Sequence, residues 1–179
     1  MKPAIRKAGL SLLLAAAGLV PGAVSAQDFA DKVKAPFLFN FARFVTWPEQ
    51  RLSGSDPLQL CVFENPEFGR ALAVSVQGKR SGSHPMQARD VAGTDSLDDC
   101  HAVYLPADGI QSLGAERLAE LAKRNVLTVH EAEDAVPGGV IRFYLENRRV
   151  RFEVNRRAAD QAGLQVSSKL LSVAKIADS

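Results

Sequence analysis

Two cysteines, Cys61 and Cys100, are the residues whose number and spacing most directly indicate a chemical role. In an exported protein, as the N-terminus described below predicts, an even number of cysteines favours a disulfide. The alternative is two unpaired, buried thiols. Closing a loop of about 40 residues would stabilise the fold by roughly 4 kcal/mol on the chain-entropy account, which is an upper value. His84, His101 and His130 are scattered and give no zinc spacing, so no metal site is predicted.

The sequence contains no strong catalytic motif. Ser172 and Lys175 match the S-x-x-K pattern of serine acylases, but the S-D-N and K-T-G motifs that accompany it are missing. No nucleophile elbow, P-loop or dinucleotide-binding glycine pattern occurs. Carboxylates within 98–99 and 131–134 fall on expected loops, where such groups are usually solvated rather than tuned for acid–base catalysis. We therefore expect a protein that is not an enzyme and needs no cofactor, with a hydrolase built on Ser172 and Lys175 as the catalytic alternative.

Basic side chains are densest near the C-terminal end, at Arg142, Arg148, Arg149, Arg151, Arg156 and Arg157. Because successive side chains of a strand alternate, Arg149, Arg151 and Glu153 would share one face while the intervening apolar residues face the core. Guanidinium groups on an edge strand can bind carboxylates or phosphates of a partner. The alternative is a solvated edge that resists aggregation.

The apolar pattern predicts the elements that carry these residues. Apolar residues recur at three- and four-residue steps in a first helix, at Val33, Phe37, Phe41 and Phe44. Trp47-Pro48 ends this helix, because the residue before a proline avoids the helical region. Short apolar strands are expected at 58–63, 84–88, 102–105 and 126–129, with helices at 66–76 and about 113–125 between them.

The C-terminal third predicts a hairpin followed by helices. Strands at 140–145 and 150–154 are joined by a link so short that they must be antiparallel. Asn155 caps a helix to about 162, and a last amphipathic helix is expected at 168–176. Strands that alternate with helices imply a parallel sheet covered on both faces. The predicted fold is a single three-layer α/β domain with a mixed, mostly parallel sheet and a C-terminal antiparallel hairpin.

The N-terminus has the order of a secretory signal. Three basic residues precede an apolar run from Ala8 to Val20, and small residues at 24–26 offer a cleavage site. The run of about 13 residues is short for a membrane-spanning helix, although an uncleaved anchor is the alternative. We expect a signal peptide at 1–26 and one domain at 27–179. Without the leader, 19 basic residues balance 20 acidic ones, and this gives no electrostatic footprint for nucleic acid.

Several segments in order resemble the YfiR-like family. The segment 34–48, KAPFLFNFARFVTWP, resembles the opening of that family. Further segments follow in the family's order, at 60–63, 100–105, 126–129, 138–141, 150–155 and 162–171. The resemblance covers nearly the whole chain after the leader.

The resemblance implies a periplasmic regulator of cyclic di-GMP signalling and thus of biofilm formation. The best understood type of member represses a membrane-bound diguanylate cyclase of the YfiN type by binding its periplasmic part. An outer-membrane protein of the YfiB type can draw the repressor away, and redox state modulates it. The implied partners are therefore the periplasmic domain of such a cyclase and a YfiB-type protein. A homodimer is a further partner, expected from the exposed edge strands and not from the resemblance.

The resemblance also implies site residues. Cys61 and Cys100 match one cysteine pair of the family, whereas a second pair of some relatives falls near Ala135 and Arg142, where this chain has no cysteine. This departure weighs against redox switching and leaves a structural bridge.

Partner binding is expected at two positions that match the family and at two taken from strand geometry. Ile141 matches an exposed apolar position, and Glu153 lies in the R-F-E-V-N motif; Arg149 and Arg151 are added from their strand face. The alternative function is a periplasmic small-ligand sensor for another membrane receptor. Its ligand would lie in the crevice at the carboxyl ends of the strands, which is a usual site in open α/β sheets.

Overall fold

The computed structural model describes residues 26–93, 95–134 and 136–177. In chain order the elements are α1 (Ala26–Arg43), β1 (Val45–Thr46), β2 (Leu58–Phe63), α2 (Pro66–Val76), β3 (Arg80–Ser81), β4 (His84–Val91), the 3₁₀ helix η1 (Asp95–Asp99), β5 (Ala102–Leu105), α3 (Ala107–Lys123), β6 (Leu127–His130), β7 (Ile141–Glu146), β8 (Arg149–Asn155), α4 (Arg156–Gln161), β9 (Gln165–Val166), α5 (Ser168–Leu171) and β10 (Lys175–Ala177). The predicted signal peptide at 1–26 lies almost wholly outside these residues.

Within the described chain, eight strands form one sheet in the order β10-β8-β7-β6-β5-β2-β4-β3. Neighbouring strands from β4 through β7 are parallel, whereas β8 is antiparallel to β7 and β3 is antiparallel to β4. The short strands β1 and β9 form a separate antiparallel pair. This topology confirms the predicted α/β fold with a mostly parallel sheet and an antiparallel hairpin near its end.

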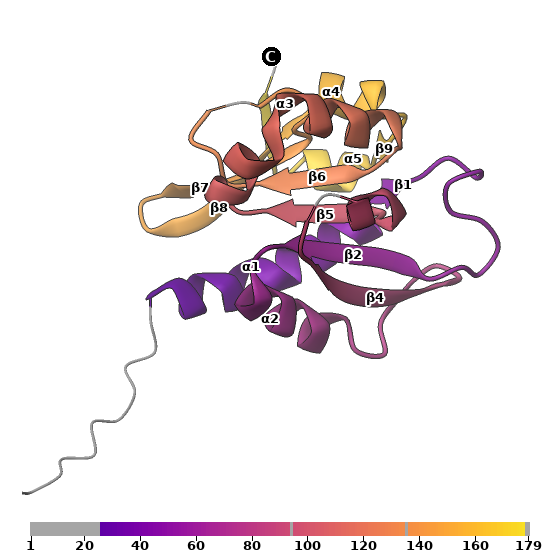
Figure 1. Cartoon of the computed structure of the whole chain (residues 1–179), viewed down its shortest axis with the longest axis horizontal. Coiled ribbons are helices and arrows are strands. Elements are labelled where there is room, and N and C mark those ends of the chain that lie inside the picture. The colour runs from indigo at the N-terminus through magenta and orange to yellow at the C-terminus, as the bar shows by residue number, and fades with distance from the viewer. Residues whose placement is uncertain (1–25, 94, 135, 178–179) are drawn as a thin grey trace, which may run out of the picture.

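Helices cover the sheet on both faces. In Figure 1, α1 and α2 lie on one side of the sheet and α3 lies on the other. The alternation of side chains along β5 shows the two layers, because Ala102 and Tyr104 pack with α1 and α2 while Val103 and Leu105 pack with α3. No helix in the described ranges is long and apolar enough to span a membrane.

The apolar stripe of α1 packs against the β7–β8 hairpin. The ring of Phe41 lies 4.7 Å from that of Phe152 and 5.5 Å from that of Phe143, measured between ring centroids. Phe37 contacts the same two strand rings at about 6 Å. These aromatic contacts orient the hairpin against α1, so the stripe belongs to the core.

Local sequence signals set the hairpin and the caps. Asn147 and Arg148 have positive φ angles of 50° and 60°, as a two-residue turn of type I′ requires. The side chain of Asn155 accepts a hydrogen bond from the Ala158 amide at 2.9 Å and begins α4, as the sequence predicts. Gly163, with a φ angle of 64°, follows the end of that helix.

The expected helix at 168–176 is wrong. Only Ser168–Leu171 is helical, and Lys175–Ala177 forms β10, which pairs in parallel with Glu153–Asn155 of β8. Strand pairing supplies hydrogen bonds to the edge of β8, and this tertiary gain outweighs a short helical pattern. The strand β8 is consequently an open edge only over its first half, at 149–152.

Candidate functional site

A disulfide joins Cys61 of β2 to Cys100, the residue before the turn into β5. The strands β2 and β5 are neighbours, and the two Cα atoms lie 5.9 Å apart. Both cysteines are fully buried. The guanidinium group of Arg51 donates a hydrogen bond of 2.6 Å to the Cys100 carbonyl and holds this segment in place. A bridge inside the core has the character of a structural bond, because reductants in solvent cannot reach its sulfurs.

The hairpin face comprises the outward-facing residues Arg142, Tyr144, Arg149, Arg151, Glu153 and Lys175 of β7, β8 and β10, together with Leu145, which lies beside the turn opposite Val150 and on the other face of the strand. Arg142 and Glu153 lie opposite each other in the β7–β8 register. Arg142 Nε donates to Glu153 Oε1 at 2.7 Å, and Lys175 Nζ lies 3.6 Å from Glu153 Oε2. Both oxygens of Glu153 are therefore engaged, and only 7% of the residue is exposed.

Electrostatics keep this pair ionised. The hydrogen bond from Arg142 lowers the pKa of the Glu153 carboxyl, while burial works in the opposite direction. The same hydrogen bond raises the pKa of Arg142. Arg142 also donates to the Glu133 carbonyl, and its guanidinium lies 5.8 Å from the centre of the Tyr144 ring. The centre of the hairpin face is thus a fixed array of charges.

His130 lies beneath this array at the end of β6. It pairs in register with Arg142 and is 2% exposed. Burial, reinforced by the charge of Arg142, lowers the pKa of His130 to about 4. The imidazole is therefore neutral near pH 7 and adds no charge to the hairpin face.

Two further predicted site residues, Arg149 and Arg151, lie in the first half of β8, which β10 does not cover. Arg149 and Arg151 are exposed, and Arg151 Nε lies 3.6 Å from an oxygen of the equally exposed Glu146. Such an exposed pair is worth little in stability, so Arg151 is available to a partner. The strand places Arg149, Arg151 and Glu153 on one face, as predicted, with Glu153 at the end that β10 covers.

The expected exposure of Ile141 is wrong. Ile141 is 0% exposed and lies between Val129 of β6 and Val154 of β8. The alternation along β7 directs Ile141 and Phe143 into the core against α1. Leu145, 73% exposed beside the turn, is the large apolar side chain that the hairpin does present. The pairing of apolar positions between β7 and β8 carried this signal in the sequence.

A groove opens beside the hairpin at the carboxyl ends of the parallel strands. This carboxyl-end groove has a volume of about 400 Å³ and is lined by Lys34, Glu131, Ala132, Glu133, Arg142, Phe143, Tyr144 and Leu145. Lys34 Nζ of α1 contacts Glu131 Oε1 at 2.5 Å, and the Tyr104 hydroxyl donates to the same oxygen. Burial raises the pKa of Tyr104, so the hydroxyl keeps its proton and acts as a donor. Sequence reasoning treated Glu131 as a solvated loop residue and did not single out Lys34.

A model of the YfiR/HmsC-like family matches residues 31–175. The chain belongs to this family. A search of curated proteins finds none that matches the chain. The YfiR/HmsC-like family is periplasmic and regulatory, and it interacts with periplasmic partners in the diguanylate cyclase system. The match begins at Asp31 of α1 and ends at Lys175 of β10, so it includes every residue of the hairpin face and of the carboxyl-end groove.

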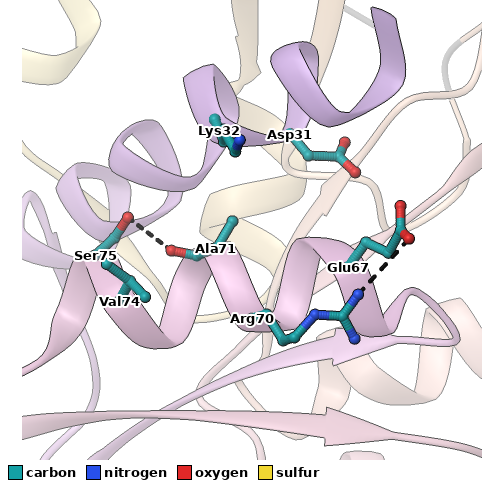
Figure 2. A pocket seen from close by; sticks show the side chains of 7 residues that line it. All are labelled: Asp31, Lys32, Glu67, Arg70, Ala71, Val74 and Ser75. Atoms are coloured by element: carbon teal, nitrogen blue, oxygen red, sulfur yellow. Dashed lines mark hydrogen bonds and ion pairs between the residues drawn. The ribbon is translucent and has the colours of Figure 1, made fainter. Parts of the chain in front are cut away.

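In this YfiR/HmsC-like chain a second groove separates α1 from α2. It has a volume of about 570 Å³, and Figure 2 shows its lining side chains, which are Asp31, Lys32, Glu67, Arg70, Ala71, Val74 and Ser75. Asp31 is buried, whereas Val74 is 76% exposed. Arg70 and Glu67 form an exposed ion pair at 3.6 Å. Opposite charges line this groove in equal number.

The regulatory, non-catalytic character of the YfiR/HmsC-like family agrees with the geometry at Ser172 and Lys175. The Ser172 hydroxyl donates to the Lys169 carbonyl at 3.0 Å. Lys175 lies in β10, with its ammonium group directed to Glu153. The two residues therefore do not form a nucleophile and base on one helix.

Proposed function

We propose that this protein represses a membrane-bound diguanylate cyclase of the YfiN type by binding its periplasmic domain. The observation that carries the proposal is the family match over 31–175, which supports a periplasmic regulator of that system. Repression from the periplasm would lower cyclic di-GMP in the cell and limit biofilm formation.

The hairpin face is the proposed contact surface. Leu145 offers an exposed apolar anchor beside the turn of the hairpin, and Arg149 and Arg151 offer positive charge on its outer face. An apolar anchor within a charged rim is how interfaces usually concentrate binding energy. Arg142 and Lys175 are held in position by Glu153, so Glu153 acts through them. Ile141 supports the surface from beneath. The matching surface of the cyclase would carry carboxylates around an apolar pocket.

The hairpin face would also serve two further interactions, namely release from repression by an outer-membrane partner and self-association. A YfiB-type outer-membrane protein that bound the hairpin face would compete with the cyclase for the regulator. The open edge of β8 at 149–152 also leaves main-chain groups available to a second strand, as a homodimer could use. Both partners are part of the proposal.

Direct binding tests the proposal. The exported protein is titrated into the purified periplasmic domain of the cyclase from the same organism, and binding is followed by calorimetry at two salt concentrations. We expect saturable binding that weakens with salt, because charged groups supply part of the recognition. A cyclase domain that does not bind the protein at micromolar concentrations would contradict the proposal.

A second candidate function is a small-ligand sensor. The carboxyl-end groove favours it, because a groove of about 400 Å³ lies where open α/β sheets usually bind ligands. A saturable rise in melting temperature with one member of a metabolite panel would support this function. The two functions are compatible, since a ligand beside the hairpin can shift the equilibrium of partner binding.

A further inference from the structure

We infer that the carboxyl-end groove binds a small zwitterion with an apolar body, namely an apolar α-amino acid. Its carboxylate would accept from Lys34, and its ammonium group would donate to Glu131. The inference rests on the ligand-sensor function and is independent of cyclase repression.

Lys34 supplies the donor. Its ammonium group carries three N–H donors, and the residue is only 6% exposed although it lines the groove. Among the described residues, Glu131 Oε1 is the acceptor that Lys34 Nζ contacts. Because Lys34 is buried, water hydrates its remaining N–H donors incompletely. An anionic group in the groove could accept from them and would be stabilised there.

Glu131 supplies the acceptor. Its Oε1 atom receives both the Lys34 ammonium and the Tyr104 hydroxyl. Within the described chain, Oε2 of the same carboxylate has no hydrogen-bond partner, and 23% of the side chain is exposed. An ammonium donor and a carboxylate acceptor therefore stand side by side on one wall of the groove.

Charge balance selects a zwitterion. Lys34 and Glu131 together are neutral, so an anionic ligand would place an uncompensated negative charge beside Glu131 and a cationic ligand would repel Lys34. Arg142 does not change this balance, because the carboxylate of Glu133, which also lines the groove, carries the opposite charge. A molecule that carries both charges on neighbouring groups satisfies both residues without adding net charge.

The β7 residues of the groove set the character of the ligand body. Phe143, Tyr144 and Leu145 of β7 also line the groove, and the side chain of Leu145 is largely exposed. An apolar side chain laid along them would remove this surface from water. The groove volume falls in the range of about 300–1,000 Å³ that small-molecule sites show. Tyr144 and Leu145 also belong to the hairpin face, so a bound amino acid would contact the proposed partner surface directly.

Calorimetry with matched probes tests the inference. L-leucine, L-methionine and L-phenylalanine are titrated into the exported protein, alongside 4-methylpentanoate, which lacks the ammonium group, and 3-methylbutylamine, which lacks the carboxylate. We expect at least one of the amino acids to bind saturably, with leucine binding at least about tenfold more tightly than either singly charged analogue. Analogues that bind as tightly as leucine would overturn the inference, and so would the failure of all three amino acids to bind.

Two variants locate the site. Glu131→Gln keeps the size of the side chain and an acceptor for Tyr104, and we expect it to weaken amino-acid binding at least about tenfold. Ala132→Trp fills the groove from its loop and should abolish binding. Glu116→Gln, an exposed change on α3, is the matched control and should leave affinity unchanged. If another metabolite binds and Ala132→Trp removes it while amino acids do not bind, the ligand class is wrong and the sensor function stands. If amino acids bind equally well to all variants, the site is wrong.

Discussion

Single side chains on the hairpin face combine a structural and a recognition role. Glu153 illustrates this, because the motif that singles it out from the sequence gives no sign of its burial. The structure places it opposite Arg142 and beside Lys175, with both oxygens occupied. A residue held in this way positions neighbouring charges, and its replacement alters the fold as well as the surface.

Replacing Glu153 should therefore lower stability. We expect Glu153→Gln to cost about 1–2 kcal/mol at pH 7, because Arg142 loses a charged partner. Since the fold lowers the pKa of Glu153, its contribution is present above the unfolded pKa near 4.5 and is lost as pH falls through the folded value. The melting temperature of the variant should thus approach that of the parent protein below pH 4.5. Equal melting temperatures at pH 7 would show that the pair contributes nothing.

His130 predicts a second, separate pH dependence. The folded protein binds a proton on His130 only near pH 4, whereas the unfolded chain binds it near 6.5. Stability should therefore fall by about 3 kcal/mol as pH drops from 6.5 to 4. His130→Asn should flatten this part of a denaturant-stability profile, while the loss below pH 4.5 that Glu153 contributes should remain. An unchanged slope between pH 6.5 and 4 in the variant would rule out this role of His130.

The elements of secondary structure were largely predictable from local patterns, and their neighbours in space were not. Apolar runs locate β2, β5 and β6, and asparagine caps locate the starts of α2 and α4. The predicted helix at 168–176 is wrong in its second half. Its helical spacing gives no sign that the edge of β8 has main-chain groups open for pairing. The carboxyl-end groove joins α1 to a loop about 100 residues later. Such long-range contacts leave no local signal.

Charge reversal on the hairpin should weaken binding to the cyclase domain without changing the stability of the protein. Arg149→Glu combined with Arg151→Glu reverses two exposed charges, so the melting temperature should stay within about 1–2 °C of the parent. Affinity for the cyclase domain should fall by roughly tenfold or more, with a weaker dependence on salt. Arg43→Glu combined with Lys123→Glu, two exposed changes outside the hairpin face, is the control and should bind normally. Normal binding by the hairpin variant would remove these arginines from the contact surface.

The described chain is built around one eight-stranded sheet with an apolar core on each face, and one bridge joins neighbouring parts of that sheet. The disulfide closes a loop of 39 residues between β2 and the approach to β5. Cys61→Ser combined with Cys100→Ser should lower the free energy of unfolding by about 2–4 kcal/mol, and cyclase binding should persist well below the melting temperature. Loss of binding by a fully folded reduced protein would instead assign the bridge a switching role.

The central claim is repression of a diguanylate cyclase from the periplasm, and cellular cyclic di-GMP tests it most directly. The nucleotide is measured in the organism that carries the gene, with the gene deleted, restored, restored without residues 1–26, and restored as the double hairpin variant of Arg149 and Arg151. We predict a clear rise on deletion that only the exported parent protein reverses. Unchanged cyclic di-GMP after deletion, or full reversal by the chain without its leader, would contradict the account.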